Sequence, residues 1–339
     1  FMPGGLGMVV VGASMIFGGI SGSAIADSAA IGSVMIKNMA KEGYNKAFAA
    51  GLVAAAGTIG IIIPPSIPML IYGFVGNVSV ADLFLAGMVP GIMFGVAFMA
   101  VCYYVGKSTG CDPGGRTTTR AELWSSFIGT APALFMPILI LGGIFSGWVT
   151  PTEAAALAVV YGLVVTIFIY RDFKIKDLPQ LMIDAFVTSA TVMVVIGATT
   201  VLGWLITLEQ MPQVLVGFVQ DLSSSPWVFL ILVNLVLLIL GLVLDPVPAI
   251  LLTAPLFLPT AQAFGIDPVH LGVIMTCNVA VGLFTPPVGA TLYVASRISG
   301  VGVLSIARRM GMLYFAAICA LLLVTYVPAV SMTMVHLFR

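Results

Sequence analysis

Long apolar stretches dominate this sequence and restrict what it can fold into. A helix that crosses the hydrocarbon core of a bilayer needs about 20 predominantly apolar residues. Only 8% of the 339 residues are charged, whereas a soluble domain carries about 25%. We therefore predict an all-α polytopic membrane protein in a lipid bilayer. The stretches long enough to cross are 47–75, 82–105, 123–147, 152–170, 180–208, 271–296 and 309–330.

Two regions carry apolar runs that are too short to cross. The first pairs residues 4–19 with 28–36, and the second pairs 226–242 with 249–259. Helix-breaking residues separate the two runs of each pair, so each pair predicts a re-entrant helical hairpin. Irregular backbone at that depth is tolerated only where protein or a water-filled cavity satisfies its polar groups.

The basic residues support this topology. If both hairpins are re-entrant, twelve of the thirteen Lys and Arg residues face one side, and only Arg339 faces the other. The positive-inside rule makes the first side cytoplasmic. The first hairpin then opens to the cytoplasm and the second to the outside.

The two halves of the chain resemble each other at an offset of 222 residues. The Gly-x-x-x-Pro-Pro run that begins at Gly60 aligns with the one that begins at Gly282, and Ser23 aligns with Asp245. Because the hairpins open to opposite sides, we predict an inverted repeat. Paired helix interruptions in such repeats are a strong pointer to the binding site of a transporter.

The interruptions suggest ion chemistry. Consecutive prolines break a helix, which frees carbonyl oxygens that suit Na⁺ and helix N-termini that suit a carboxylate. Hydroxyl and amide groups near the breaks and hairpin tips extend this oxygen-rich set, and we see no transition-metal ligand pattern. We therefore predict Na⁺ as the coupling ion and no organic cofactor. The polar residues concerned are Ser21, Ser23, Asp27, Thr58, Ser66, Asp245, Asn278 and Thr285.

Each charged candidate also has a structural interpretation. Asp27 and Asp245 are each expected to cap a returning hairpin arm, which does not exclude contact with an ion. Asp27 is also expected to share hydroxyl partners, and Asp245, between Leu244 and Pro246, to need a cation or donors from the facing break. Arg297 either snorkels to the interface or binds a substrate carboxylate. Glu153, which follows Pro151, is expected to stabilise a helix start.

Two other functional classes fit the sequence poorly. The run Gly19-Ile20-Ser21-Gly22 matches the Gly-x-Ser-Gly of rhomboid-type intramembrane serine proteases, but such a serine needs a nearby base. His270 is predicted on the opposite side, so we expect no enzyme activity. With 13 basic and 13 acidic residues, the chain lacks the basic surface of a nucleic-acid-binding protein.

Three motifs together resemble one known family. The run from Gly18 to Asp27, the two Gly-x-x-x-Pro-Pro runs, and Thr150-Pro-Thr-Glu-Ala-Ala-Ala156 look like the large membrane (M) subunit of TRAP transporters, with the sialic-acid branch as the nearest match. Members of this family have further N-terminal helices, so we expect a chain beginning at Phe1 to lack its start. Divalent-anion:sodium symporters are the runner-up, but they lack the Ser-Gly-Ser-Ala-x-Ala-Asp run.

The resemblance implies a mechanism and partners. It implies an elevator-type transporter of the bacterial inner membrane, coupled to Na⁺ and not to ATP. A small membrane (Q) subunit and a periplasmic substrate-binding protein are the implied partners. The implied substrate is an organic anion, first sialic acid and next a C4-dicarboxylate.

The implied sites fall at the tips and breaks. One ion site combines Ser21 and Ser23 with the Gly57–Pro65 break, including Thr58 and Gly60. The other combines Asp245 with the Gly282–Pro286 break, which contains Thr285, and with the nearby Asn278. The substrate is expected between them, with Ser23, Asp27, Ser66 and Arg297 as contacts. We divide the chain into a first repeat (1–105), connecting helices (106–179) and a second repeat (180–339).

Overall fold

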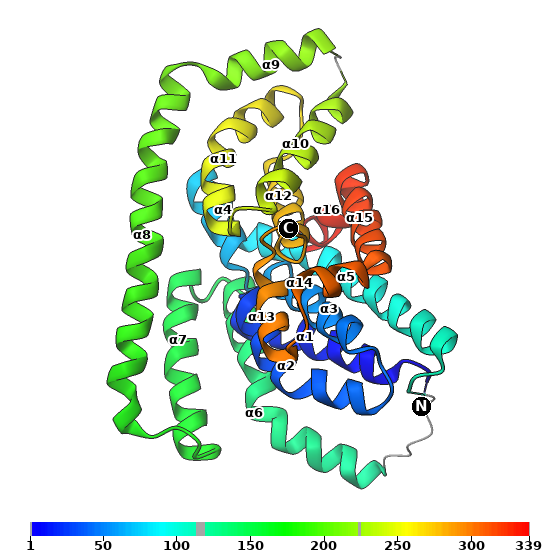
Figure 1. Cartoon of the computed structure of the whole chain (residues 1–339). Helices are drawn as coiled ribbons and strands as arrows, with labels where there is room; N and C mark the ends of the chain where they lie inside the picture. The colour runs from blue at the N-terminus through cyan, green and yellow to red at the C-terminus, as the bar shows by residue number, and fades with distance from the viewer. Residues whose placement is uncertain (1, 113–118, 223–224, 339) are drawn as a thin grey trace. The chain divides into compact units, whose positions relative to one another are not determined.

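The computed structural model describes residues 2–112, 119–222 and 225–338. These residues form helices and no β-strand, so the all-α prediction is confirmed for the described part of the chain. The helices of the first half, shown in blue to cyan in Figure 1, are α1 (Gly5–Ser21), α2 (Ala24–Lys41), α3 (Lys46–Gly57), the 3₁₀ turn η1 (Thr58–Ile61), α4 (Ile67–Gly76) and α5 (Val80–Thr109).

The remaining helices follow in two groups. The middle of the chain forms α6 (Arg120–Phe145), α7 (Pro151–Val164), the π-helical turn η2 (Val165–Ile169), the 3₁₀ turn η3 (Ile175–Asp177), α8 (Leu178–Leu208) and α9 (Met211–Leu222). The second half forms α10 (Pro226–Gly241), α11 (Pro246–Ala263), α12 (Pro268–Leu283), α13 (Ala290–Ser299), α14 (Val303–Arg308), α15 (Gly311–Tyr326) and α16 (Pro328–Phe338).

The helix lengths suit a membrane protein. Five helical segments are long and apolar enough to cross a bilayer, and up to seven if each bent pair counts as one span, within the residues described. The predicted spans 82–105, 123–147, 152–170 and 180–208 correspond to α5, α6, α7 with η2, and α8. The predicted spans 47–75 and 271–296 are both broken in the middle, between η1 and α4 and between α12 and α13.

The returning arms of the two hairpins are longer than the sequence suggested. We expected short runs at 28–36 and 249–259, but α2 and α11 each have 18 residues. Both helices continue beyond the apolar run at each end, and polar residues such as Asn38 and Gln262 extend their C-terminal turns, because a helix needs hydrogen-bonding continuity and not uniform apolarity. By length and composition alone α11 could cross a membrane.

Contacts divide the chain into two compact units. Unit 1 contains residues 1–115 and 202–339, and unit 2 contains residues 116–201. This division follows spatial contacts and does not test the repeat-based division made from the sequence.

Unit 1 brings its two halves into close contact. The half-helix α13 packs on α2, and the half-helix α4 packs on α11, as the neighbouring ribbons in Figure 1 show. The turn η1 also contacts α12. A hydrogen bond of 2.8 Å from the Tyr72 hydroxyl to the Pro268 carbonyl joins α4 to the start of α12. The breaks of both halves therefore belong to one packed core.

Unit 2 consists mainly of α6, α7 and most of α8. The helix α7 begins with a capping box: the Thr150 amide donates to Glu153 at 2.8 Å, and the Glu153 amide donates to the Thr150 hydroxyl at 3.3 Å. The structural role predicted for Glu153 is confirmed. The helix α8 buries none of its 31 residues within the described structure, although it is apolar throughout. Its surface is therefore suited to lipid or to other protein chains.

Candidate functional site

The first hairpin tip is a tight turn of small residues. Helix α1 ends at Ser21, and Gly22 adopts φ +60° while its amide donates to the Gly18 carbonyl at 3.1 Å. A left-handed residue at this position favours glycine. Ser23 then caps α2 by accepting a hydrogen bond of 3.4 Å from the Ala26 amide. The expected capping role of Asp27 is therefore wrong, because Ser23 occupies the cap position and Asp27 lies in the first turn.

Asp27 is instead a buried carboxylate with one free oxygen. Its side chain is fully buried, and its Oδ1 accepts a hydrogen bond from the Ser21 hydroxyl. Ser21 Oγ in turn accepts from the Ser23 amide at 3.1 Å. Asp27 Oδ2 has no hydrogen-bond partner among the described residues. A buried unpaired carboxylate oxygen is costly, so this atom is a candidate ligand for a cation or a proton donor.

The first break packs directly against this tip. A methyl group added to Gly60 would overlap Asp27 Oδ2, and one added to Gly22 would lie 2.8 Å from the Pro65 carbonyl oxygen. Ser21, Asp27, Gly60 and Pro65, four of the predicted site residues, are thus brought together. Glycine at position 60 leaves the room that the carboxylate occupies.

The hydroxyls at the first break are oriented by local hydrogen bonds. Thr58 Oγ1 donates to the Ala55 carbonyl at 2.7 Å, and Ser66 Oγ donates to the Ile61 carbonyl at 2.5 Å. Ser66 also caps α4 by accepting from the Met69 amide at 3.3 Å. Both side chains are buried. Their hydrogens are used within the segment, which leaves oxygen lone pairs for an ion.

The second tip differs from the expectation for Asp245. This residue occupies the N-cap position of α11, but its side chain makes no capping hydrogen bond and is exposed. No hydrogen bond or ion pair joins it to the Gly282–Pro286 break within the described residues. The side chain is exposed although Leu244 and Pro246 flank it, because chain neighbours do not determine burial at a tip. The part of Asp245 in a Na⁺ site stays a prediction.

The second tip contacts its break through backbone atoms. A methyl group at Gly282 would lie 2.5 Å from the Gly241 carbonyl carbon, so the end of α10 crosses α12 at closest approach. Beyond the break, the Val288 amide donates to the Leu242 carbonyl at 3.2 Å. Thr285 is half-buried and donates to the Val281 carbonyl at 2.6 Å.

Asn278 lies one turn before Gly282 and belongs to a buried polar cluster. Its amide nitrogen donates to Asn234 Oδ1 at 2.7 Å and to the Ile274 carbonyl at 2.8 Å. The Asn234 amide donates to Thr325 Oγ1 at 3.2 Å. Asn278 Oδ1 is buried without a hydrogen-bond partner among the described residues. The sequence analysis missed Asn234 and Thr325; an asparagine within the apolar run 226–242 was the available signal.

Two predicted roles gain no support from contacts. Arg297 is exposed in the last turn of α13, and its binding of a substrate carboxylate stays a prediction. His270 contacts Ser331 and Thr325 through its two ring nitrogens, whereas the Ser21 hydroxyl pairs with Asp27. The serine–histidine pair of an intramembrane protease is therefore not formed by these residues.

Residues 1–330 match the family described as "Tripartite ATP-independent periplasmic transporter, DctM component". The C4-dicarboxylate TRAP transporter large permease protein DctM of Pseudomonas aeruginosa is 42% identical over 331 residues, which are 98% of this chain and 77% of that protein. The sialic acid TRAP transporter large permease protein SiaM of Vibrio cholerae is 38% identical over 99% of this chain and 79% of its own length.

A third relative is matched over a smaller share of its own length. The isethionate TRAP transporter permease protein DctMQ of Oleidesulfovibrio alaskensis is 38% identical over 98% of this chain but only 52% of its own length. These matches cover nearly the whole sequence and decide against the divalent-anion:sodium symporters. They also place the chain in a family of transporter subunits and not of enzymes. The chain belongs to the DctM family, the large permease subunits of TRAP transporters.

Proposed function

We propose that this large permease subunit couples the uptake of an organic anion to Na⁺ at the contact between the first hairpin tip and the first broken helix. The observation that carries this proposal is the buried Asp27 carboxylate, whose free Oδ2 faces Gly60 at the break. Na⁺ is a small hard cation that prefers oxygen ligands. We propose that oxygens of Ser21, which bonds Asp27, and of Thr58 in the break, together with backbone carbonyls of the break, complete the ion shell.

The helix bounds support an inverted repeat. Adding 222 to the bounds of α2 gives those of α11, and the same offset carries the first residue of α3 to that of α12. The contacts follow the same correspondence: α13 of the second half packs on α2 of the first half, and α4 of the first half packs on α11 of the second half. Gly43 and Gly265, also 222 residues apart, adopt φ +89° and +71°. A two-fold axis in the membrane plane relates such halves in many secondary transporters.

The half-helix N-termini suit an anionic substrate. Helices α4 and α13 begin shortly after the two breaks, and the N-terminal amide groups and dipole of a helix favour an anion. The relatives are named for C4-dicarboxylate, sialic acid and isethionate, and all three substrates are organic anions. We propose an organic anion for this chain, with a carboxylate as the recognised group.

The partners follow from the family. Its description is tripartite, and the relative DctMQ combines two components in one name. We propose that a small membrane subunit and a periplasmic binding protein work with this chain in a bacterial inner membrane. The exposed apolar surface of α8 is available for lipid or for the small subunit. Elevator movement of unit 1, which holds both hairpins and both breaks, is the proposed transport step.

One reconstituted assay tests the proposal. Proteoliposomes with both partners are supplied with C4-dicarboxylate, sialic acid or isethionate, in Na⁺ or with Na⁺ replaced by K⁺ or choline at fixed pH. We expect uptake of one anion that needs Na⁺ and the binding protein. Undiminished uptake without Na⁺ would overturn the coupling.

The inverted topology has its own test. Cysteine is introduced at Ser23 or at Asp245 in a background without the native cysteines, and an impermeant thiol reagent is applied to each membrane face. We expect the two tips to be labelled from opposite faces. Labelling of both tips from the same face only would contradict the inverted arrangement.

A further inference from the structure

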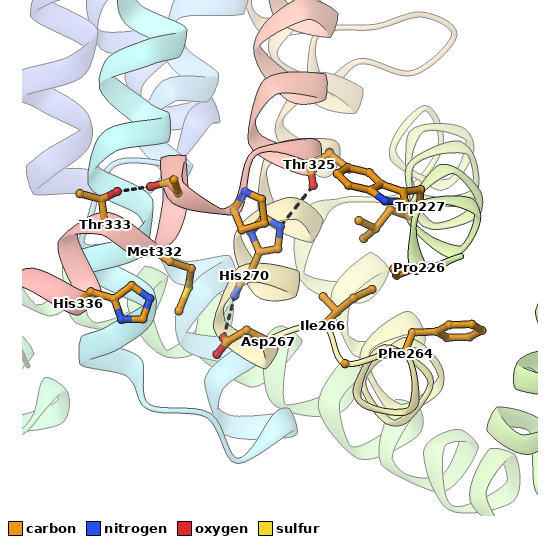
Figure 2. Close-up of a pocket in the computed structure, with 14 residues that line it drawn as sticks. Pro226, Trp227, Phe264, Ile266, Asp267, His270, Thr325, Met332, Thr333 and His336 are labelled. Carbon is orange, nitrogen blue, oxygen red and sulfur yellow. Dashed lines mark hydrogen bonds between the residues drawn. The ribbon is translucent and has the colours of Figure 1, made fainter. Parts of the chain in front are cut away.

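A pocket of about 570 Å³ lies at one end of unit 1. The residues that line it do not belong to either break. The start of α10, the connection from α11 to α12, and the ends of α15 and α16 form its walls, as Figure 2 shows. Both histidines of the chain, His270 and His336, line it together with Asp267. Under the predicted orientation this pocket opens to the periplasm.

His270 is held by two hydrogen-bonding contacts of different kinds. Only 3% of the residue is exposed. Its Nδ1 lies 2.7 Å from Ser331 Oγ, and its Nε2 lies 3.3 Å from the Thr325 carbonyl oxygen. Ser331 Oγ also lies 3.1 Å from the Pro328 carbonyl oxygen. These three contacts join α12, α15 and α16.

The hydrogens available to a neutral His270 cannot satisfy all three contacts. A carbonyl oxygen only accepts, so Nε2 must carry a hydrogen to bond Thr325. Nδ1 then needs the single Ser331 hydrogen, which the Pro328 carbonyl also needs. In the other neutral tautomer, Nδ1 donates to Ser331, but the Nε2 lone pair faces the Thr325 carbonyl. Each neutral form leaves one contact unmade.

A second proton on the ring resolves the conflict. Nδ1–H donates to Ser331 Oγ, the Ser331 hydroxyl donates to Pro328, and Nε2–H donates to Thr325. We propose that His270 is a proton-binding site, reached from this pocket, whose protonated form completes the hydrogen bonding among α12, α15 and α16. No bond other than the N–H bond forms, and the proton comes from pocket water.

The surroundings bear on the charge of the protonated ring. Burial opposes it, whereas the hydrogen bond to the Thr325 carbonyl and the Asp267 carboxylate favour it. Helices α10 and α11 carry no ionisable side chain. The ionisable groups near this end of α12, on the helices packed against it or on its own cap, are Asp267, Tyr72 on α4, Asp82 on α5, Tyr326 on α15 and His336 on α16.

The proton site connects to the transport core through hydrogen bonds. Thr325 accepts from His270 through its carbonyl, and its hydroxyl pairs with Asn234, which holds Asn278 one turn before Gly282. The protonation state of the His270 ring therefore affects the hydrogen bonding of α12, the helix that leads into the second break. This connection goes beyond the proposed Na⁺ coupling and does not depend on it.

Hydrogen–deuterium exchange at the histidine C2 position tests the proposal, because its rate reports imidazole protonation. Only two histidines are present, and His336→Gln assigns the remaining signal to His270. The intact subunit in detergent or nanodiscs is examined from about pH 8 to about pH 4.5. We expect a titration midpoint for His270 within this range.

Ser331→Ala is the decisive variant. Without the Ser331 acceptor the protonated ring loses a hydrogen bond, so we expect the midpoint to fall by about one pH unit, a roughly tenfold weaker proton affinity. Thr333→Ala is the matched control, since this hydroxyl on the same helix bonds the Ala329 carbonyl one turn earlier. Absence of a His270 midpoint in the range would overturn the proposal. So would a Ser331→Ala midpoint no lower than that of Thr333→Ala, in variants with unchanged melting temperature.

Discussion

The two hairpin-and-break regions of unit 1 share a frame but place their polar groups differently. In the first region the buried carboxylate of Asp27 lies in the tip and faces the break at Gly60. In the second region the tip carboxylate, Asp245, is exposed, and the amides of Asn234 and Asn278 form a buried pair within the helices. At the offset of 222 residues Asp245 aligns with Ser23, and Asp27 aligns with Ala249, so the two tips carry their carboxylates at different positions.

The residues that determine the backbone recur in both regions, but the buried polar side chains differ. The frame depends on caps, prolines and glycines that recur at the offset of 222 residues. The buried amide side chains do not recur: Asn278 aligns with Ala56, and Asn234 aligns with Gly12. If the two regions bind ions, they do so with different ligands, and we expect the stronger charge dependence in the first region.

The largest expected effect is at the glycine of the first break. In Gly60→Ala the added methyl overlaps Asp27 Oδ2, which is held by Ser21. The added methyl would force the tip away from the break, so we expect loss of nearly all uptake. Gly282→Ala would meet Gly241 backbone at 2.5 Å, and we expect a similar loss. Proteoliposome uptake per folded protein is the measurement.

Overpacking also lowers stability, by about 1–3 kcal/mol or more. Gly311→Ala is the control, because nothing lies within 4 Å of a methyl group there. Normal uptake by Gly60→Ala, at normal expression, would show that the tip does not need to approach the break.

The second expected effect distinguishes the two carboxylates. Asp27→Asn keeps the shape of a side chain beside Gly60 but removes its charge, so we expect the Na⁺ concentration for half-maximal uptake to rise about tenfold or more. Asp245→Asn changes an exposed group, so we expect a change within about twofold. This order reverses the expectation from the sequence.

The measurement is the Na⁺ dependence of uptake for both variants, normalised to folded protein. A Na⁺ curve that shifts in Asp245→Asn and stays in place in Asp27→Asn would restore the original assignment. It would also show that the exposed tip carboxylate becomes buried in another state of the transporter.

The third effect concerns the amide cluster of the second region. Asn278→Ala leaves Asn234 Oδ1 without its 2.7 Å donor, and loss of a partner in a buried site costs about 1–3 kcal/mol. We expect a lower melting temperature for Asn278→Ala and for Asn234→Ala, and a double variant less destabilised than the sum. Additive effects would indicate that the two amides do not act as a pair.

Much of the frame was predictable because local residues determine it. Pro64-Pro65 and Pro286-Pro287 mark the breaks, and the glycines at 22 and 241 mark where the tips begin. The ligand environment was not predictable in the same way. Whether Asp27 or Asp245 is buried depends on which element packs over it, and Asn234 meets Thr325 across 91 residues of sequence. The flanking residues of a carboxylate carry neither piece of information.

The smallest effect tests the shared frame through two aligned helix caps. Asn45 Oδ1 accepts from the Ala47 and Phe48 amides at 3.0 and 3.3 Å, and Asp267 Oδ1 accepts from the Val269 and His270 amides at 2.7 and 3.3 Å. Replacing such a cap by alanine costs about 1 kcal/mol. If the frame is shared, Asn45→Ala and Asp267→Ala should lower the melting temperature by similar amounts, about 2 °C each.

Asp267 differs from Asn45 in one respect that sharpens this test. It lines the pocket beside His270, so its charge acts there as well as on the helix. Asp267→Asn should keep the cap and leave the melting temperature near that of the unchanged protein at neutral pH, because asparagine caps as well as aspartate. Asn45→Asp is the reciprocal control at the aligned position. A large loss in Asp267→Asn alone would mean that the carboxylate stabilises the second region through its charge, and that the two caps are alike in geometry but not in energy.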